Sequence, residues 1–264
     1  MTMKEMNTQY QLDTLLKRVE KPGRYIGGEL FSAKKDPQKV DARFAFAFPD
    51  LYEIGMSYLG LQILYHQLNK QENIYCGRGF APAGDMEALM RQEQVPLMTL
   101  ETKTPLVEMD FVGFTLQYEM SFSNILNMLD LAGIPMFSKD RGEDMPLVVA
   151  GGPCAYNAEP LADCVDLFCL GEAEESVQLV ADTIIEWKEQ GKPGGKKGLL
   201  KTLATQQGNY VPAFYTPHYT ADGAFDFLEV TEPGVPATIE KCVVADEEHV
   251  FFPNKPIVPN IDIV

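Results

Sequence analysis

The stretch that decides the fold is Asp50-Leu51-Tyr52-Glu53-Ile54-Gly55, which lies between an apolar run and a helical run. The apolar run at 43–48 predicts a buried strand, and residues 57–68 have the apolar spacing of a helix. A strand, a turn carrying Asp and Gly, and a helix form the first crossover of an open α/β sheet. Ligands of such sheets bind at the carboxyl ends of the strands, so we expect this turn to belong to a binding site.

The alternation of strand and helix continues along the chain. Buried strands are predicted at 111–116, 147–150 and 165–170, short strands at 73–78, 97–100 and 134–137, and helices at 83–92, 122–132 and 175–190. Nearly continuous apolar strands are typical of a parallel sheet that helices cover on both faces. We therefore expect an α/β fold with a Rossmann-like, doubly wound, mostly parallel sheet over residues 43–190.

The two ends of the chain differ from this pattern. Residues 1–42 are predicted to form a short helix at 13–20 and an extended arm. Residues 191–251 are predicted to be a β-rich extension, with a mobile Gly- and Lys-rich loop at 191–198 and strands at 210–219, 224–229 and 238–245. Residues 252–264 are rich in proline and have the composition of an extended linker.

Composition and charge exclude several classes of function. The net charge of -16 and the pI near 4.6 argue against direct binding to nucleic acid, which needs clustered Lys and Arg. No apolar run is long enough to span a bilayer, and the N-terminal residues have no signal-peptide core. The five cysteines are odd in number and lack close pairs, which argues against a disulfide framework. We expect a cytoplasmic protein with no membrane partner.

Three further loops follow predicted strands, at 115–123, 151–157 and 171–172. Gly151 and Gly152 remove side chains where a flat or bulky ligand would need to approach the backbone, although a tight turn would use the same residues. Thr115, Ser121 and Ser123 offer hydroxyl groups near a helix start, where they could also act as helix caps. These loops support one another because they occur in the chain order that a doubly wound sheet brings to one edge.

The loops also resemble a known family. Gly151-Gly152-Pro153, followed by a strand that ends in Gly171-Glu172, resembles the cobalamin-binding domain that precedes the catalytic barrel in many radical S-adenosylmethionine proteins. Residues 25–29, 49–57 and 126–135 are similar to the N-terminal half of one uncharacterised, cobalamin-binding-type family of these proteins. The resemblance implies a cobalamin-binding module that holds its cofactor against a downstream cluster for a methyl transfer or another radical step on an unknown substrate.

The resemblance assigns candidate roles to the first loop. Cobalamin-dependent mutases and methionine synthase carry Asp-x-His-x-x-Gly, whose His is the lower ligand of cobalt, and this chain has Asp50-x-Tyr52-x-x-Gly55. A phenol is a poorer cobalt ligand than imidazole, so we expect a His-off cobalamin with Tyr52 beneath the corrin or hydrogen-bonded through its hydroxyl. The residues expected to bind the cofactor are Asp50, Tyr52, Gly55, Met56, Ser57, Thr115, Leu116, Gln117, Ser121, Ser123, Gly151, Gly152, Pro153, Gly171 and Glu172.

The cluster motif of radical S-adenosylmethionine enzymes is absent. Three thiolates in Cys-x-x-x-Cys-x-x-Cys would hold the [4Fe–4S] cluster, and Cys154, Cys164 and Cys169 do not have that spacing. We expect them to be buried thiols, with no metal site and no catalytic residue in this chain. The cluster and S-adenosylmethionine are expected in a barrel domain beyond a truncated chain, or in a separate chain of a split protein, acting in cis or in trans.

Two other functions fit the same residues. The fold could have lost its corrin site and serve as a docking or substrate-recognition domain, because Tyr52, Tyr118 and Met120 are bulky. A cavity filled by side chains at the strand ends would favour that alternative. A nucleotide-binding Rossmann enzyme is disfavoured because Gly-x-Gly-x-x-Gly does not follow the first strand.

Overall fold

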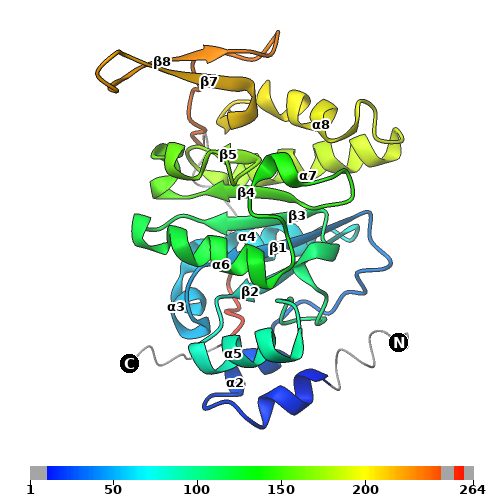
Figure 1. The fold of residues 1–264 in the computed structure, drawn as a ribbon. Coiled ribbons are helices and arrows are strands. Elements are labelled where there is room, and N and C mark those ends of the chain that lie inside the picture. Colours follow the sequence, from blue (N-terminus) through cyan, green and yellow to red (C-terminus); the bar gives the residue numbers. More distant parts are fainter. Residues whose placement is uncertain (1–10, 245–252, 259–264) are drawn as a thin grey trace.

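Six strands form the central sheet of the computed structural model (Figure 1), which describes residues 11–244 and 253–258. The strand order is β2-β1-β3-β4-β5-β6; β1 to β5 pair in parallel, and β6 is antiparallel to β5. This arrangement confirms the α/β prediction and the mostly parallel sheet. The strands are β1 Ala42–Phe48, β2 Ile74–Phe80, β3 Phe111–Thr115, β4 Leu147–Gly151, β5 Leu167–Cys169 and β6 Asn209–Tyr210.

Strand β1 lies inside the sheet because aromatic and small side chains alternate along it. Phe44 pairs with Phe111 of β3, and their rings are 4.9 Å apart. Ala45 and Ala47 point to the opposite face, where they are also buried. A strand that is apolar on both faces is stable only when helices cover both faces.

Helices cover the two faces as the right-handed crossover rule requires. Helix α4 (Leu59–Lys70) packs against α7 (Ala173–Glu189) on one face. Helices α5 (Gly84–Glu93) and α6 (Phe122–Leu131) contact each other and lie in front of the sheet in Figure 1. The remaining helices are residues 11–16, α2 Gly23–Ile26, α3 Tyr52–Ser57 and α8 Gly195–Ala204, with 3-10 segments η1 Leu106–Glu108, η2 Glu119–Ser121, η3 Ser138–Asp140, η4 Pro153–Tyr156, η5 Glu159–Leu161 and η6 Pro212–Phe214.

The N-terminal arm is fixed to the sheet by a buried arginine. Arg78 of β2 has no exposed surface, and its guanidinium contacts Glu29 of the arm at 2.8 Å and Glu101 at 2.6 Å. The guanidinium also lies over the Tyr65 ring, 5.2 Å from its centroid. Burial opposes the charge, but the two carboxylates outweigh it and raise the pKa of Arg78. The arm therefore docks through a buried charge cluster.

Two of the predicted short strands, and the predicted strand at 238–245 within its described part, do not form. Residues 97–100 make only the bridge Met98–Pro105, and the described part of 238–245 makes only the bridge of Cys242 with Gly171. At 134–137 the backbone acceptors are used elsewhere, because Arg141 donates to the carbonyls of Pro135 and Met136. These backbone groups are satisfied without a neighbouring strand.

Two helical predictions also need correction. The turn at Asp50 to Gly55 continues into α3, and Tyr58 in extended conformation separates α3 from α4, so the predicted helix 57–68 is two helices. The predicted mobile loop at 191–198 contains the start of α8. Leu199, Leu200 and Leu203 anchor that helix in the core.

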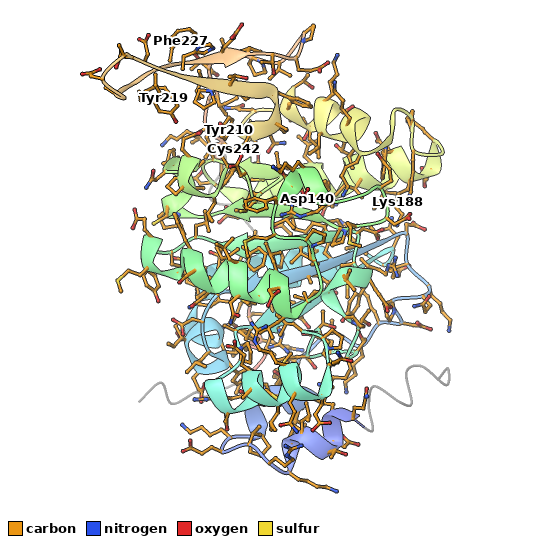
Figure 2. The ribbon with its side chains drawn as sticks, viewed as in Figure 1. Asp140, Lys188, Tyr210, Tyr219, Phe227 and Cys242 are labelled. Atoms are coloured by element: carbon orange, nitrogen blue, oxygen red, sulfur yellow. The ribbon has the colours of Figure 1, made fainter. Side chains whose placement is uncertain are left out.

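The C-terminal extension is divided between two sheets. The predicted strand 210–219 breaks at Pro212, because proline has no N–H to donate; its first part is β6. Strands β7 (Tyr215–Tyr219) and β8 (Phe225–Val230) form a separate antiparallel hairpin that projects at the top of Figure 1 and carries Tyr219 and Phe227 (Figure 2). Within the described residues, no helix has the length and hydropathy of a membrane span.

Candidate functional site

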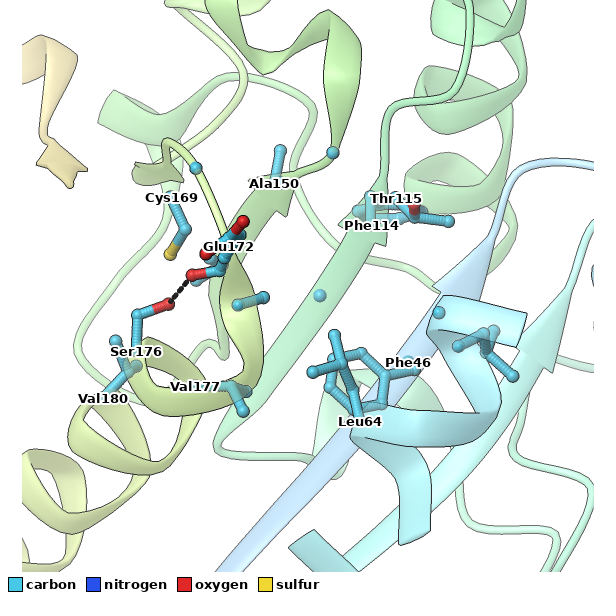
Figure 3. A pocket seen from close by; sticks show the side chains of 18 of the residues that line it. Phe46, Leu64, Phe114, Thr115, Ala150, Cys169, Glu172, Ser176, Val177 and Val180 are labelled. Carbon is cyan, nitrogen blue, oxygen red and sulfur yellow. Dashed lines mark hydrogen bonds between the residues drawn. The ribbon is translucent and has the colours of Figure 1, made fainter. Parts of the chain in front are cut away.

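A pocket of about 460 Å³ opens beneath the carboxyl ends of the strands, on the face covered by α4 and α7 (Figure 3). Its floor is formed by β1, β3, β4 and β5. Leu64 of α4 stands on one side, with Val177 and Val180 of α7 on the other (Figure 3). The pocket thus lies where an open α/β sheet binds its ligands.

Two glycines leave the floor of the pocket without side chains. Gly113 of β3 lies between Phe46 and Val149 in register, and Gly151 lies between Thr115 and Cys169. A Cβ at Gly113 would lie 2.6 Å from the Phe111 ring, whereas a Cβ at Gly151 would meet nothing closer than the Cys169 carbonyl oxygen at 3.5 Å. A flat group can therefore lie directly against the backbone at Gly151.

The rest of the lining is apolar, with polar groups at the mouth. Thr115 Oγ1 accepts a hydrogen bond from Gln117 Nε2 at 2.6 Å, and Ser176 Oγ donates to the Glu172 carbonyl oxygen at 3.2 Å. Burial, reinforced by the neighbouring Cys242 thiol, raises the pKa of Cys169 to about 12, so this thiol is neutral. An apolar pocket with a few polar groups is typical of small-molecule sites.

The structure brings six of the predicted residues together in this pocket. They come from the loops after β3, β4 and β5 and are Thr115, Gly151, Gly152, Pro153, Gly171 and Glu172. Leu116 and Ser121 are instead buried beside the pocket, and the Ser121 hydroxyl donates to the Tyr118 carbonyl oxygen. Gln117 reaches the site only through Thr115, and Ser123 is exposed on α6.

The first loop is oriented differently. Tyr52 donates from its hydroxyl to Glu29 Oε1 at 3.1 Å, and its ring meets the Phe80 ring edge-on at 5.4 Å. The Met56 sulfur accepts a hydrogen bond from Arg78 Nη1 at 2.9 Å. A Cβ at Gly55 would lie 2.3 Å from the Phe80 ring. Helix α3 therefore turns these side chains toward β2 and the arm, outside the pocket.

Asp50 and Ser57 do not line the pocket either. The Tyr118 hydroxyl donates to Asp50 Oδ2 at 3.2 Å, which joins the first loop to the loop after β3. Asp50 Oδ1 accepts from the Leu51 N–H at 2.7 Å, and Ser57 Oγ donates to the Ile54 carbonyl oxygen at 2.6 Å. These contacts hold the two loops together above the strands.

Sequence reasoning missed part of the pocket. Gly113, an isolated glycine inside a strand, is a recognised signal of close backbone approach, and it could have been found. Lys241 and Cys242 also line the pocket, and no local pattern indicated that they would. Across the described residues, no group of three or more His, Cys, Asp or Glu side chains is placed to hold a metal ion.

Comparison with known proteins identifies the family. The family described as "Radical SAM proteins, N-terminal" matches residues 60–212, which is more than half of the chain and includes α4, β3, β4, β5 and α7. An uncharacterised protein of Methanocaldococcus jannaschii is 27% identical over 141 residues, which are 52% of this chain and 26% of that protein. The chain thus spans about a quarter of this relative's length. No solved structure matches. The chain belongs to the radical S-adenosylmethionine (SAM) N-terminal family.

Proposed function

We propose that this chain is the cobalamin-binding module of a radical S-adenosylmethionine protein. The observation that carries the proposal is the open pocket at Gly151, where the floor has no side chain and a Cβ would have 3.5 Å of clearance. Cobalamin carries a planar benzimidazole base on its nucleotide arm, and a flat aromatic group suits a bare backbone floor between apolar walls. The family match supports the association with a radical S-adenosylmethionine protein.

The residues of the chain have defined tasks in this proposal. Gly151 provides the bare backbone against which the base would lie, and Leu64, Val177 and Val180 exclude water from it. Thr115 and Glu172 offer polar groups at the mouth. The first loop presents no imidazole to cobalt, which supports a His-off cofactor. When bound, cobalamin would supply a carrier for a methyl group or a site for another radical step.

The module would work with a radical S-adenosylmethionine barrel that carries the [4Fe–4S] cluster, in cis or in trans. The alternative is a docking or substrate-recognition domain that has lost its corrin site. That alternative fits a cavity filled by side chains, and the pocket here is open. We therefore prefer the cofactor-binding function.

Titration with hydroxocobalamin tests this function. The purified chain, handled anaerobically, is expected to co-elute with one equivalent of hydroxocobalamin and to shift its absorption spectrum. After reduction to Co(II), the EPR spectrum is expected to lack coupling to a histidine nitrogen. Failure to co-elute would contradict the proposal, and a histidine-ligated cobalt would contradict the His-off state.

Replacing Tyr52 by phenylalanine tests whether the first loop contributes to protein stability or to ligand binding. The variant loses the hydrogen bond to Glu29 at 3.1 Å, which is expected to cost about 0.5–1.5 kcal/mol of unfolding free energy. Hydroxocobalamin affinity is expected to stay within about twofold, a change of about 0.4 kcal/mol, because Tyr52 does not line the pocket. Chemical denaturation and the titration above measure the two effects. A large loss of affinity with unchanged stability would place Tyr52 at the cofactor.

A further inference from the structure

Residues 241–244 run along the carboxyl end of β5 and add a short parallel pairing to it. The Cys242 N–H donates to the Leu170 carbonyl oxygen at 2.8 Å, and the Glu172 N–H donates to the Cys242 carbonyl oxygen at 3.0 Å. These bonds form a parallel bridge between Gly171 and Cys242. We call residues 241–244 the strap.

Two glycines provide the space that the strap occupies. Gly171 and Gly208 have φ angles of 99° and 79°, which favour glycine. A Cβ at Gly171 would lie 2.1 Å from the Cys242 carbonyl oxygen, and a Cβ at Gly208 would lie 2.6 Å from the Cys242 sulfur. Both positions therefore need glycine for the strap to dock.

Side chains complete the docking contacts. Gln207 Nε2 donates to the Lys241 carbonyl oxygen at 2.9 Å, and Cys242 Sγ donates to the Gln207 carbonyl oxygen at 3.1 Å. The Val244 N–H donates to the Glu172 carboxylate. Val244 is buried, whereas 58% of Val243 is exposed, so one side of the strap faces the protein and the other faces solvent.

The strap is also a wall of the pocket, because Lys241 and Cys242 line it. Within the described residues, its backbone pairs with the sheet only through the bridge at Gly171. A short segment with few buried apolar contacts opens at a lower free energy than the strands of the core. The sheet, α4 and α7 are therefore fixed walls of the pocket, and the strap is a wall that can detach.

We propose that a ligand in the pocket holds the strap in its docked position, so that occupancy of the pocket and docking of the C-terminal segment are coupled. The identity of the ligand as cobalamin rests on the proposed function. Because the ligand contacts the strap only when it is docked, binding stabilises the docked state, and the docked state binds more tightly. The two effects must be equal in free energy.

The coupling extends along the C-terminal segment. After the strap, the described residues resume at 253–258, where Ile257 is buried and the Lys255 ammonium lies 5.9 Å from the centroid of the Phe31 ring in the N-terminal arm. The C-terminal segment is thus attached at the pocket and at the arm. Occupancy of the pocket would control the first of these two attachments.

Amide hydrogen exchange tests the proposal without measuring activity. Saturating hydroxocobalamin is expected to slow exchange of the Glu172, Cys242 and Val244 amides by about tenfold or more, as linkage requires for a tightly bound ligand. The Leu97 amide, which donates to Leu131 far from the pocket, is the internal control and should not change.

Two variants test whether docking of the strap affects ligand binding. Cys242→Pro removes the N–H that donates to Leu170, and it is expected to weaken hydroxocobalamin binding about tenfold, an ordinary coupling of about 1.4 kcal/mol. Val243→Ala, which keeps every backbone bond of the strap, is the matched control and should bind as the parent does. If Cys242→Pro lacks the far-UV circular dichroism of the parent, Gln207→Ala, which removes the Nε2 donor to the Lys241 carbonyl oxygen, replaces it.

The outcomes separate the two proposals. Binding with slowed exchange at the three amides and a weaker Cys242→Pro variant supports the coupling. Binding with unchanged exchange, or with equal affinity of the parent and an undocked variant, overturns the coupling and leaves the proposed function intact. Absence of hydroxocobalamin binding in the parent overturns the proposed function, and this inference with it.

Discussion

Replacing Arg78 by alanine is expected to lower the free energy of unfolding by about 3–5 kcal/mol, the usual cost of removing one partner from a buried ion pair. Arg78 is fully buried, and its guanidinium pairs with Glu29 at 2.8 Å and Glu101 at 2.6 Å. The variant would leave both carboxylates in the interior without a cation. Urea denaturation at pH 7 measures the loss.

The dependence on pH gives this prediction a second readout. In the parent, burial opposes ionisation of Glu29, but Arg78 outweighs it and holds the pKa of Glu29 below its usual 4.5. Its contribution to stability is therefore present above pH 4.5 and is lost as the pH falls through the lowered value. Without Arg78, the charge that lowers the pKa of Glu29 most is lost, and burial is opposed only by a backbone hydrogen bond and by the hydrogen bond from Tyr52. The loss of stability that the parent shows as the pH falls below 4.5 is therefore expected to be smaller in the variant.

Arg91→Ala is the matched control. Arg91 also contacts two carboxylates, Glu87 at 3.0 Å and Asp130 at 2.6 Å, but these pairs lie on the surface of α5 and α6. Exposed pairs are screened by solvent and contribute little. Its denaturation midpoint should remain close to that of the parent. Equal midpoints for both variants would show that Arg78 is not essential for the core.

The sequence predicted the sheet but not the buried charge cluster. Buried parallel strands follow from continuous apolar runs such as Leu147-Val148-Val149-Ala150, because such runs are stable only between two helical layers. Arg78, by contrast, is expected on the surface from its type alone. Its partners are distant in the sequence: the docked arm brings Glu29 to β2, and the loop after α5 brings Glu101. No local pattern carries that information.

The candidate site was also predicted only in part from the sequence. The loops after β3, β4 and β5 were predicted, because parallel strands place their carboxyl ends at one edge of the sheet. Tyr52 was predicted at the cofactor, but its orientation depends on α3 and on Glu29, which are set by tertiary packing. A strand was predicted at 238–245, but its pairing with Gly171 was not, because that pairing spans a long sequence separation.

Replacing Gly151 by valine is expected to abolish the space for a flat ligand without unfolding the protein. A Cβ at this position has 3.5 Å of clearance from its nearest neighbour, and Gly151 does not have a positive φ. Valine also favours strands, whereas glycine weakens them by roughly 0.5–1 kcal/mol. Hydroxocobalamin affinity is expected to fall about tenfold or more, a loss of at least roughly 1.4 kcal/mol of binding free energy. Equilibrium dialysis measures the affinity, and thermal denaturation monitors the fold.

The choice of position makes the outcome specific to the pocket. Gly113 shares the floor, but a Cβ there would strike the Phe111 ring at 2.6 Å, so a loss of binding could follow from damage to the sheet. Gly142→Val introduces the same side chain at an exposed loop residue with nothing within 4 Å, and should retain full affinity. Hydroxocobalamin affinity is expected to fall less in Gly151→Ala than in Gly151→Val, because alanine places a smaller side chain on the floor of the pocket. Because the walls and the mouth remain unchanged in this series, unchanged affinity in the valine variant would show that the ligand does not use the floor.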